Sequence, residues 1–358
     1  MQENDFHLHS YEAGDTLFQI HPDQPAPSGA KICVVIGPNG SGKSRLAGEV
    51  VRELIRINSL RNGLPLSATP KDSDGSRPDT STISYKQAGK NCRIERKLDR
   101  LFGWIEEAPA SMDKLPFPSK LLAVAHLPVD KFFFTHSEVN DFYSYLGLRQ
   151  ATNLTTTGAL EFKVVLSLFY GLQQPFFLRK LAPWLSLLGL TGSAKLRVQF
   201  TDKATMQIVR AGDFDNFLQY ATELASRNVG STRRAQSSQS KQKFATDVKI
   251  AWTLLRRLAS EALVDDKRGG TISLPVASDM FEDNFPPAMW GHAIEGLRRL
   301  RLTSDLGLEF DKSDRSIRFQ DLSSGEQQIL GTYIRVLAEI RPNCIIFIDE
   351  PEVSLHPS

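Results

Sequence analysis

Residues 37–44 of the sequence read GPNGSGKS, which matches the spacing G-x-x-x-x-G-K-S. An apolar run, KICVVI, precedes them at residues 31–36, and apolar side chains recur at helical spacing behind them. This order predicts a strand, a glycine-rich loop and a helix from Gly42 to about Asn58. Because glycine has no Cβ, the backbone N–H groups of such a loop can turn inward around phosphate groups. The stretch therefore predicts a nucleotide-binding loop between a strand and a helix.

The polar groups of this loop have distinct expected tasks. Lys43 is expected to reach the β- and γ-phosphates, and the Ser44 hydroxyl is expected to coordinate Mg²⁺. The start of the following helix adds its positive dipole end. ATP and Mg²⁺ are the predicted ligands. The predicted nucleotide-binding residues are Gly37, Pro38, Asn39, Gly40, Ser41, Gly42, Lys43, Ser44 and Arg45.

A second apolar run ends in two adjacent carboxylates. Residues 344–350 read CIIFIDE, which is typical of a strand in the middle of a parallel sheet with both faces covered. Such strands point their carboxyl ends at the ligand crevice. We expect Asp349 to hold Mg²⁺ and Glu350 to orient or deprotonate the water that attacks the γ-phosphate. Lys43 and Glu350 are thus the expected catalytic residues of an ATPase.

A third motif lies 26 residues before Asp349, counted from Ser323 (349 − 323). Residues 322–327 read LSSGEQ, in which Ser323 and Glu326 have the spacing of a helix capping box. Taken alone, this pattern indicates only a well-capped helix. Its order and spacing relative to the other two motifs resemble the signature motif of ABC-type ATPases.

Over residues 1–143 and 305–358 the chain resembles the soluble branch of that superfamily, which contains the structural-maintenance-of-chromosomes, RecF-like and OLD-type ATPases; the segment between them is not diagnostic. Glu326 stands where transporter cassettes usually carry Gln, and DEPEVSLHP at residues 349–357 resembles the ending of stand-alone ATPases. The resemblance implies an α/β P-loop NTPase head with a mostly helical insertion. The expected domains are residues 1–143 and 305–358 for the head, and 144–304 for the insertion.

The resemblance also implies a mechanism based on two copies. The heads pair head to tail, with ATP between the phosphate loop of one copy and the signature of the other. The signature residues expected to contact that ATP are Ser323, Ser324, Gly325 and Glu326. The implied function is ATP-driven dimerisation that regulates a DNA-linked process, such as anti-phage defence or DNA repair, with a nuclease-like effector as partner.

Two features depart from the family pattern. The family's Q-loop glutamine is missing from residues 120–132 (KLLAVAHLPVDKF), where His126 or Asp130 are the candidate substitutes, although a lone histidine there is more often structural. The sequence also stops at Ser358, before the family's switch histidine. We therefore expect a fragment, or a partner chain that supplies the missing part.

Two other functions stay open. One is a nucleotide-gated scaffold with little catalysis, and the other is a transporter cassette that energises a membrane partner. The long helical stretch and Glu326 argue against the transporter cassette. The three hypotheses agree on nucleotide binding and differ in the consequence of that binding.

Composition and charge limit the partners. Lys and Arg number 43 against 41 Asp and Glu, so no global field favours nucleic acid or a membrane surface. Residues 226–243 carry five basic and no acidic side chains; a solvated loop is the plainer interpretation, and a phosphate-contacting strap on DNA or RNA is the alternative. No apolar window is long enough to span a bilayer, and three widely spaced cysteines indicate a reducing compartment. We expect a cytoplasmic protein.

Local patterns outline further elements. Residues 15–20 predict a strand, and residues 82–98 predict a hairpin around Ala88 and Gly89. Residues 120–127 predict a buried strand. From about 150 to 300 the pattern is mostly helical.

Overall fold

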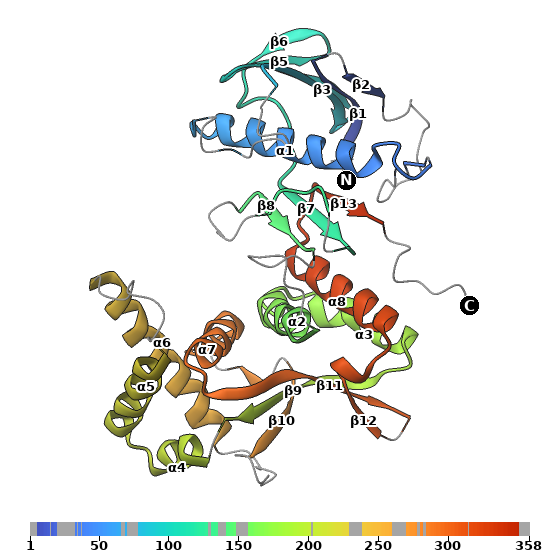
Figure 1. Ribbon diagram of the computed structural model, residues 1–358. Coiled ribbons are helices and arrows are strands. Elements are labelled where there is room, and N and C mark those ends of the chain that lie inside the picture. The colour runs from blue at the N-terminus through green and yellow to red at the C-terminus, as the bar shows by residue number, and fades with distance from the viewer. Residues whose placement is uncertain are drawn as a thin grey trace. The chain divides into compact units, whose positions relative to one another are not determined.

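Figure 1 shows a computed structural model of the chain, which falls into two compact units. The first unit contains residues 1–155 and 339–358, and the second contains residues 156–338. No helix in the described part of the chain is both long and apolar enough to cross a membrane. The structure describes residues 6–14, 16–19, 33, 35–36, 38–65, 69, 78–127, 130–134, 141–147, 157–201, 203–228, 238–259, 270–277, 280–281, 284–313 and 315–350.

The first unit contains an antiparallel sheet of six strands in the order β2-β1-β3-β4-β5-β6. The predicted strand at 15–20 and the predicted hairpin are both confirmed, since Gln87 pairs with Lys90 across the turn. Ala88 and Gly89 both have positive φ, 52° and 75°, as a tight two-residue hairpin turn requires. The strands are β1 (His7–Ala13), β2 (Thr16–Gln19), β3 (Thr80–Gln87), β4 (Lys90–Lys97), β5 (Arg100–Ile105) and β6 (Ala108–Ala110).

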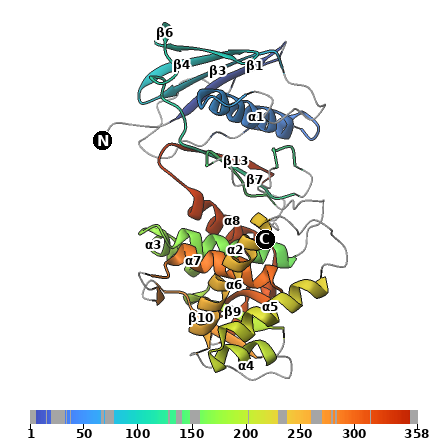
Figure 2. The ribbon, with the colours of Figure 1, turned by 90° about the vertical axis from the view of Figure 1, so that its left-hand side faces the viewer.

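Helix α1 (Lys43–Arg61) confirms the helix predicted behind the glycine-rich loop. Its apolar side chains, Val50 and Leu54 among them, share one core with side chains of β3 and β4 on one side and of β7 (Lys120–Ala125) on the other. Figure 2 shows α1 lying between the antiparallel sheet and a smaller parallel sheet. The exposed loop residues 38–42 therefore lead directly into a helix that is packed in the core of the unit.

The smaller sheet has three described strands in the order β13-β7-β8, all parallel, with β8 at Tyr143–Tyr145 and β13 at Cys344–Asp349. The buried strand predicted at 120–127 is confirmed, since β7 is fully buried. In the loop that leads into β13, Arg341 donates two hydrogen bonds, of 2.6 and 2.7 Å, to Asp141 beside β8. The start of β13 is therefore tied to the far edge of its own sheet.

Two expectations about the strands need correction. Residues Cys33, Val35 and Ile36 are described but not in a strand, and Ile36 is 88% exposed; the other residues of the predicted strand at 31–36 lie outside the described residues. Strand β13 was expected to be covered on both faces, yet Ile348 is 53% exposed. Within the described residues β13 pairs on one side only, with β7, and an edge strand keeps part of its surface in solvent.

The second unit is built around an antiparallel sheet in the order β10-β9-β11-β12. The segment from 150 to 300 is mainly helical, as the pattern indicates, but it also supplies β9 and β10 to this sheet. Alternating buried residues, Leu196, Val198 and Phe200, give β9 its core face. The strands are β9 (Thr191–Phe200), β10 (Thr271–Pro275), β11 (Thr303–Lys312) and β12 (Arg315–Arg318).

Helices cover this sheet and carry the second core of the molecule, in which Trp290 stacks on Phe169 with ring centroids 5.6 Å apart. The short η4 (Phe319–Asp321) joins β12 to α8, which carries the LSSGEQ motif at its start. The helices are α2 (Thr157–Gly171), α3 (Phe177–Leu187), α4 (Lys203–Ala211), α5 (Phe214–Asn228), α6 (Ser238–Leu258), α7 (Pro287–Arg299) and α8 (Ser324–Glu339). The predicted domain boundaries at 143 and 305 stay a prediction.

Candidate functional site

The glycine-rich loop runs into α1 through two glycines in the left-handed region. Gly40 has φ 81° and Gly42 has φ 92°, and a Cβ at either position would meet nothing within 4 Å. Backbone conformation, not space, is therefore what requires glycine here. The N–H of Ser41 donates to the Pro38 carbonyl at 3.2 Å, which closes the turn. Of the predicted loop residues, Gly37 lies outside the described part of the chain.

Lys43 and Ser44 are the first two residues of α1. The ammonium group of Lys43 donates to the Pro38 carbonyl at 3.0 Å, so it lies next to the loop backbone. Arg45 has a different orientation, because its guanidinium pairs with Glu49 one turn along the helix at 2.7 Å and is mostly exposed. Lys43 thus contacts the loop backbone, whereas the described partner of Arg45 lies on the helix.

Ser44 and Asp349 come together from opposite ends of the chain. The Ser44 hydroxyl donates to Oδ1 of Asp349 at 2.8 Å, at the carboxyl end of β13. A hydroxyl and a carboxylate in contact are oxygen donors of the kind that Mg²⁺ prefers. Within the described residues no group of three or more His, Cys, Asp or Glu could hold a metal ion, so other ligands would be water or phosphate oxygens, as is usual for Mg²⁺. The two residues fit Mg²⁺ in that form.

Glu350 follows β13 directly and adopts a left-handed backbone conformation with φ 50°. That conformation is uncommon for residues other than glycine and turns the chain sharply at the end of the strand. Residues in such conformations cluster at functional sites, although ordinary turns such as Ala88 adopt it here as well. Glu350 is partly exposed, and in the sequence it directly follows Asp349, the partner of Ser44.

The two Q-loop candidates differ in their surroundings. Asp130 is buried and its carboxylate accepts hydrogen bonds from the Phe132 N–H at 2.9 Å and from the Tyr145 hydroxyl, which indicates a structural role. His126 follows Ala125, which pairs with Asp349 across the β7–β13 ladder. His126 therefore lies at the same sheet edge as Glu350, and the geometry favours it over Asp130.

The LSSGEQ motif forms the predicted capping box at the start of α8. The Ser323 N–H donates to Oε2 of Glu326 at 2.8 Å, and the Glu326 N–H donates to Oγ of Ser323 at 3.3 Å. Oε1 of Glu326 accepts a further bond from Lys312 at 2.8 Å, which is the main reason that the pKa of Glu326 is lowered. The N–H groups of Ser324 and Gly325 belong to the first turn, where helix geometry gives them no partner within the helix.

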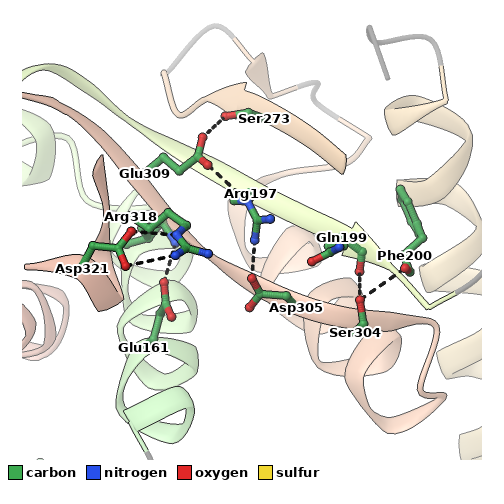
Figure 3. Close-up of polar contacts among 11 residues, drawn as sticks. Glu161, Arg197, Gln199, Phe200, Ser273, Ser304, Asp305, Glu309, Arg318 and Asp321 are labelled. Carbon is green, nitrogen blue, oxygen red and sulfur yellow. Dashed lines mark hydrogen bonds and ion pairs between the residues drawn. The ribbon is translucent and has the colours of Figure 1, made fainter. Parts of the chain in front are cut away.

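Figure 3 shows a polar cluster that the sequence did not reveal. It includes residues of β12 and η4, the two elements that directly precede the LSSGEQ motif. Arg318, the last residue of β12, donates two hydrogen bonds to Asp321 of η4 at 2.8 and 3.0 Å. Glu161 of α2 is buried and accepts the Leu308 N–H at 3.0 Å. Burial raises the pKa of Glu161 to about 7, with the neighbouring carboxylate of Asp305 acting in the same direction.

Strand β11 leaves room for Glu161 at Gly307, where a Cβ would come within 2.1 Å of its Oε1. Across the sheet, Arg197 of β9 pairs with both Asp305 and Glu309, and the Ser273 hydroxyl donates to Glu309 at 2.8 Å. One acid within the apolar face of α2 is the only signal that the sequence offers for this cluster.

Half of the basic segment 226–243 is described, and that half is helical. Helix α5 ends at Asn228 and α6 begins at Ser238, and residues 229–237 between them are among those that are not described. A loop over the whole segment is therefore wrong at both ends, whereas a solvated loop or a phosphate-contacting strap at residues 229–237 stays a prediction. Residues 351–358, which contain the LHP element at 355–357, also lie outside the described residues.

Comparison with known proteins adds one match. Residues 210–358 match the family model described as "AAA domain, putative AbiEii toxin, Type IV TA system". No curated protein matches the chain. The matched region contains the LSSGEQ motif and β13, covers less than half of the chain, and leaves out the glycine-rich loop at 37–44. It supports an ATPase of the AAA/ABC type and confirms the P-loop NTPase fold class, without distinguishing the SMC-, RecF- and OLD-like branch.

Proposed function

We propose that the chain binds and hydrolyses ATP, and that ATP-driven head-to-tail dimerisation of two copies regulates a DNA-linked process. The observation that carries this proposal is the 2.8 Å contact between Ser44 and Asp349. The two motifs are more than 300 residues apart in the chain, yet their predicted metal-binding oxygens meet at the carboxyl end of a parallel strand. Ligand crevices of α/β proteins open at that edge.

Each residue of this site has a role in the proposed reaction. Lys43 and the loop N–H groups hold the β- and γ-phosphates, while Ser44 and Asp349 hold Mg²⁺ directly or through its water shell. Glu350 accepts a proton from the attacking water or orients it. His126, at the same sheet edge, is our candidate for the position of the Q-loop glutamine.

The signature of the second copy completes the site. We assign the contact with the γ-phosphate to the Ser323 hydroxyl and the N–H groups of Ser324 and Gly325, at the positive end of α8. Glu326 was also expected to contact ATP, but its two carboxylate oxygens accept bonds from Ser323 and Lys312. We therefore give Glu326 the task of holding the start of α8.

The biological role is proposed on the family description. The description of the matched model names a "putative AbiEii toxin" and a toxin–antitoxin system, which favours a defence function over DNA repair. We place the protein in the cytoplasm and expect a nuclease-like effector as its partner. Nucleic-acid contact through residues 226–243 belongs to the same proposal.

The test compares Lys43→Ala, Glu350→Gln and the control Glu95→Gln, whose carboxylate pairs with Lys97 on the surface of β4. Lys43→Ala is expected to weaken ATP binding about 10- to 100-fold, because a charge-assisted contact with phosphate is lost. Glu350→Gln is expected to slow turnover by about 10²–10⁴-fold and to accumulate ATP-bound dimers. ATP turnover and light scattering after size-exclusion chromatography measure the two effects.

Three outcomes are informative. If Glu350→Gln neither traps ATP nor forms dimers, the cassette mechanism is wrong for this chain. Dimers that form with ATP but have the same lifetime in Glu350→Gln and the parent would favour the nucleotide-gated scaffold. Co-purification with an integral membrane subunit would favour the transporter cassette.

A further inference from the structure

We propose that Lys312 is a positioning residue for the signature: through Glu326, it fixes Ser323 in the orientation that the ATP of a second copy requires. This inference rests on the proposed function. It adds a residue, Lys312, that holds the signature in its binding orientation before ATP binds. Lys312 itself touches no nucleotide in this scheme. Its effect is transmitted by one carboxylate.

The contacts form a continuous path from Lys312 to the hydroxyl of Ser323. Lys312 donates to Oε1 of Glu326 at 2.8 Å, and the second oxygen of the same carboxylate accepts the Ser323 N–H at 2.8 Å. The Glu326 N–H in turn donates to Oγ of Ser323 at 3.3 Å. Each oxygen of Glu326 thus has its own partner, and the planar carboxylate cannot rotate without losing one of them.

This path also determines what the Ser323 hydroxyl can do. A serine hydroxyl has one hydrogen and two lone pairs. Oγ accepts the Glu326 N–H, and the Ser323 side chain also hydrogen-bonds the Glu326 carboxylate, which helps to lower the pKa of that carboxyl. The carboxylate of Glu326 therefore directs the hydroxyl hydrogen until an acceptor on the nucleotide of a second copy replaces it. A phosphate oxygen is an acceptor of the required kind. Fixing Glu326 therefore fixes the direction in which Ser323 can donate.

The fold explains why a lysine reaches this point. Lys312 is the last residue of β11 and pairs with Arg315 at the end of the β11–β12 hairpin. After β12 the chain passes through η4 into α8. This path returns Glu326 to Lys312, which lies 14 residues earlier in the sequence. Figure 1 shows the hairpin and the start of α8 in the same unit. Lys312 therefore belongs to the β11–β12 hairpin, which precedes the signature motif in the chain.

Because the Lys312–Glu326 pair is partly exposed, its effect on the orientation of the signature can be measured separately from its effect on folding stability. The side chains of Lys312 and Glu326 are 29% and 26% exposed. Ion pairs that retain contact with solvent contribute little to folding, because water screens the charges and replaces a lost partner. Removing Lys312 should leave the unit folded while releasing one oxygen of Glu326.

The same sheet provides a matched control. Lys195 of β9 pairs with Asp311 at 2.7 Å, and its side chain is also 29% exposed. Asp311 is the residue directly before Lys312, but its carboxylate makes no described contact with the LSSGEQ motif. Lys195→Met therefore removes an equivalent ion pair from the same sheet without touching the path to Ser323.

The experiment uses the full chain carrying Glu350→Gln, with Lys312→Met, Lys312→Arg or Lys195→Met added. Sedimentation velocity with Mg-ATP gives the dissociation constant of the dimer. Titration with a fluorescent ATP analogue, at a concentration where the chain is monomeric, gives ATP affinity. Lys312→Met is expected to raise the dimer dissociation constant at least about tenfold and to leave monomer affinity for the analogue unchanged. Lys312→Arg restores dimerisation to within about threefold, and Lys195→Met leaves it unchanged.

Each other result contradicts a stated part of the argument. If Lys312→Met dimerises like its parent, or if Lys195→Met weakens the dimer equally, Lys312 has no special role and the inference is wrong while the proposed function stands. If the Glu350→Gln parent stays monomeric with ATP, the proposed function fails and the inference fails with it. Equal weakening of monomer ATP affinity by Lys312→Met would also overturn the inference, because the defect would then lie outside the signature.

Discussion

The helices behind the two predicted ATP-contacting motifs are anchored in opposite ways. Helix α1 is held by charges that are fully buried: Glu53, Arg56 and Arg96 each expose 0% of their surface. The start of α8 is held by Lys312 and Glu326, which keep between a quarter and a third of their side-chain surface in solvent. The phosphate loop therefore rests on an anchor that is part of the core, and the signature rests on one at the surface.

The buried anchor is fully satisfied. Oε1 of Glu53 accepts bonds of 2.5 Å from both Arg96 and Ser81, and Oε2 accepts from Arg56 and Arg96 at 3.1 Å. Arg96 also donates to the carbonyl groups of Pro78 and Leu98. This network joins α1 to β3 and β4. Removing one member would leave the remaining charges buried without a partner, which a surface pair avoids because water replaces the missing group.

The largest expected effect comes from breaking the buried anchor. Glu53→Ala is expected to lower the free energy of unfolding by about 3–5 kcal/mol, because two buried guanidinium groups lose their counter-charge. Urea denaturation of the full chain measures the loss. Glu95→Ala is the control, since it removes only the surface pair with Lys97 and should cost less than about 1 kcal/mol. Similar losses for the two variants would remove the distinction between the anchors.

The same contrast separates what the sequence reveals from what it does not. The glycine loop, the β3–β4 hairpin and the capping box follow from short patterns in which the residues that interact are neighbours. The Glu53–Arg96 pair does not, because a charge on a helix is usually solvated, and its partner lies on a strand 43 residues away. The pairing of β9 with β11 is likewise a long-range choice between segments, which local periodicity leaves undetermined.

In the candidate site, too, the sequence revealed the residues of the motifs but not the contacts that depend on the fold. Ser44 and Asp349 were assigned from motifs, and their contact needed the fold to bring residues from both ends of the chain together. Glu161 could not be assigned, because its raised pKa depends on burial against β11 at Gly307. The exposure of Ile348 also differs from expectation, since strand composition does not say how many neighbours a strand has.

An intermediate effect is expected at Glu161, the buried acid of the signature-bearing unit. Its pKa is about 7 in the folded protein against an ordinary value of 4.5, so the folded state holds the proton more tightly between these values. The resulting stabilisation is complete below about pH 4.5 and is lost as the pH rises to about 7. Glu161→Gln should remove this pH-dependent contribution, which is on the order of 2 kcal/mol.

Urea denaturation of Glu161→Gln and the parent at pH 5 and pH 7.5 measures this contribution as a difference. Other carboxylates cancel in the comparison, and Lys163, whose pKa is lowered by burial to about 8, titrates mainly above the window. Glutamine keeps an oxygen that can accept the Leu308 N–H. If the two proteins lose stability in parallel between the two pH values, Glu161 is already ionised in the folded unit and its burial contributes no pH dependence.

The smallest effect on folding is expected at Ser323, where the role in stability and the role in binding can be separated. Ser323→Ala removes the acceptor of the Glu326 N–H and should cost about 1 kcal/mol in the free energy of unfolding. Ser323→Asp keeps a capping oxygen and should cost less, but it places a negative charge where we assign the γ-phosphate. ATP-dependent dimerisation of the Glu350→Gln protein should therefore be weakened by the alanine and abolished by the aspartate. If aspartate dimerises like serine, the tip of α8 carries no phosphate, and its surface anchor serves only to hold a helix in place.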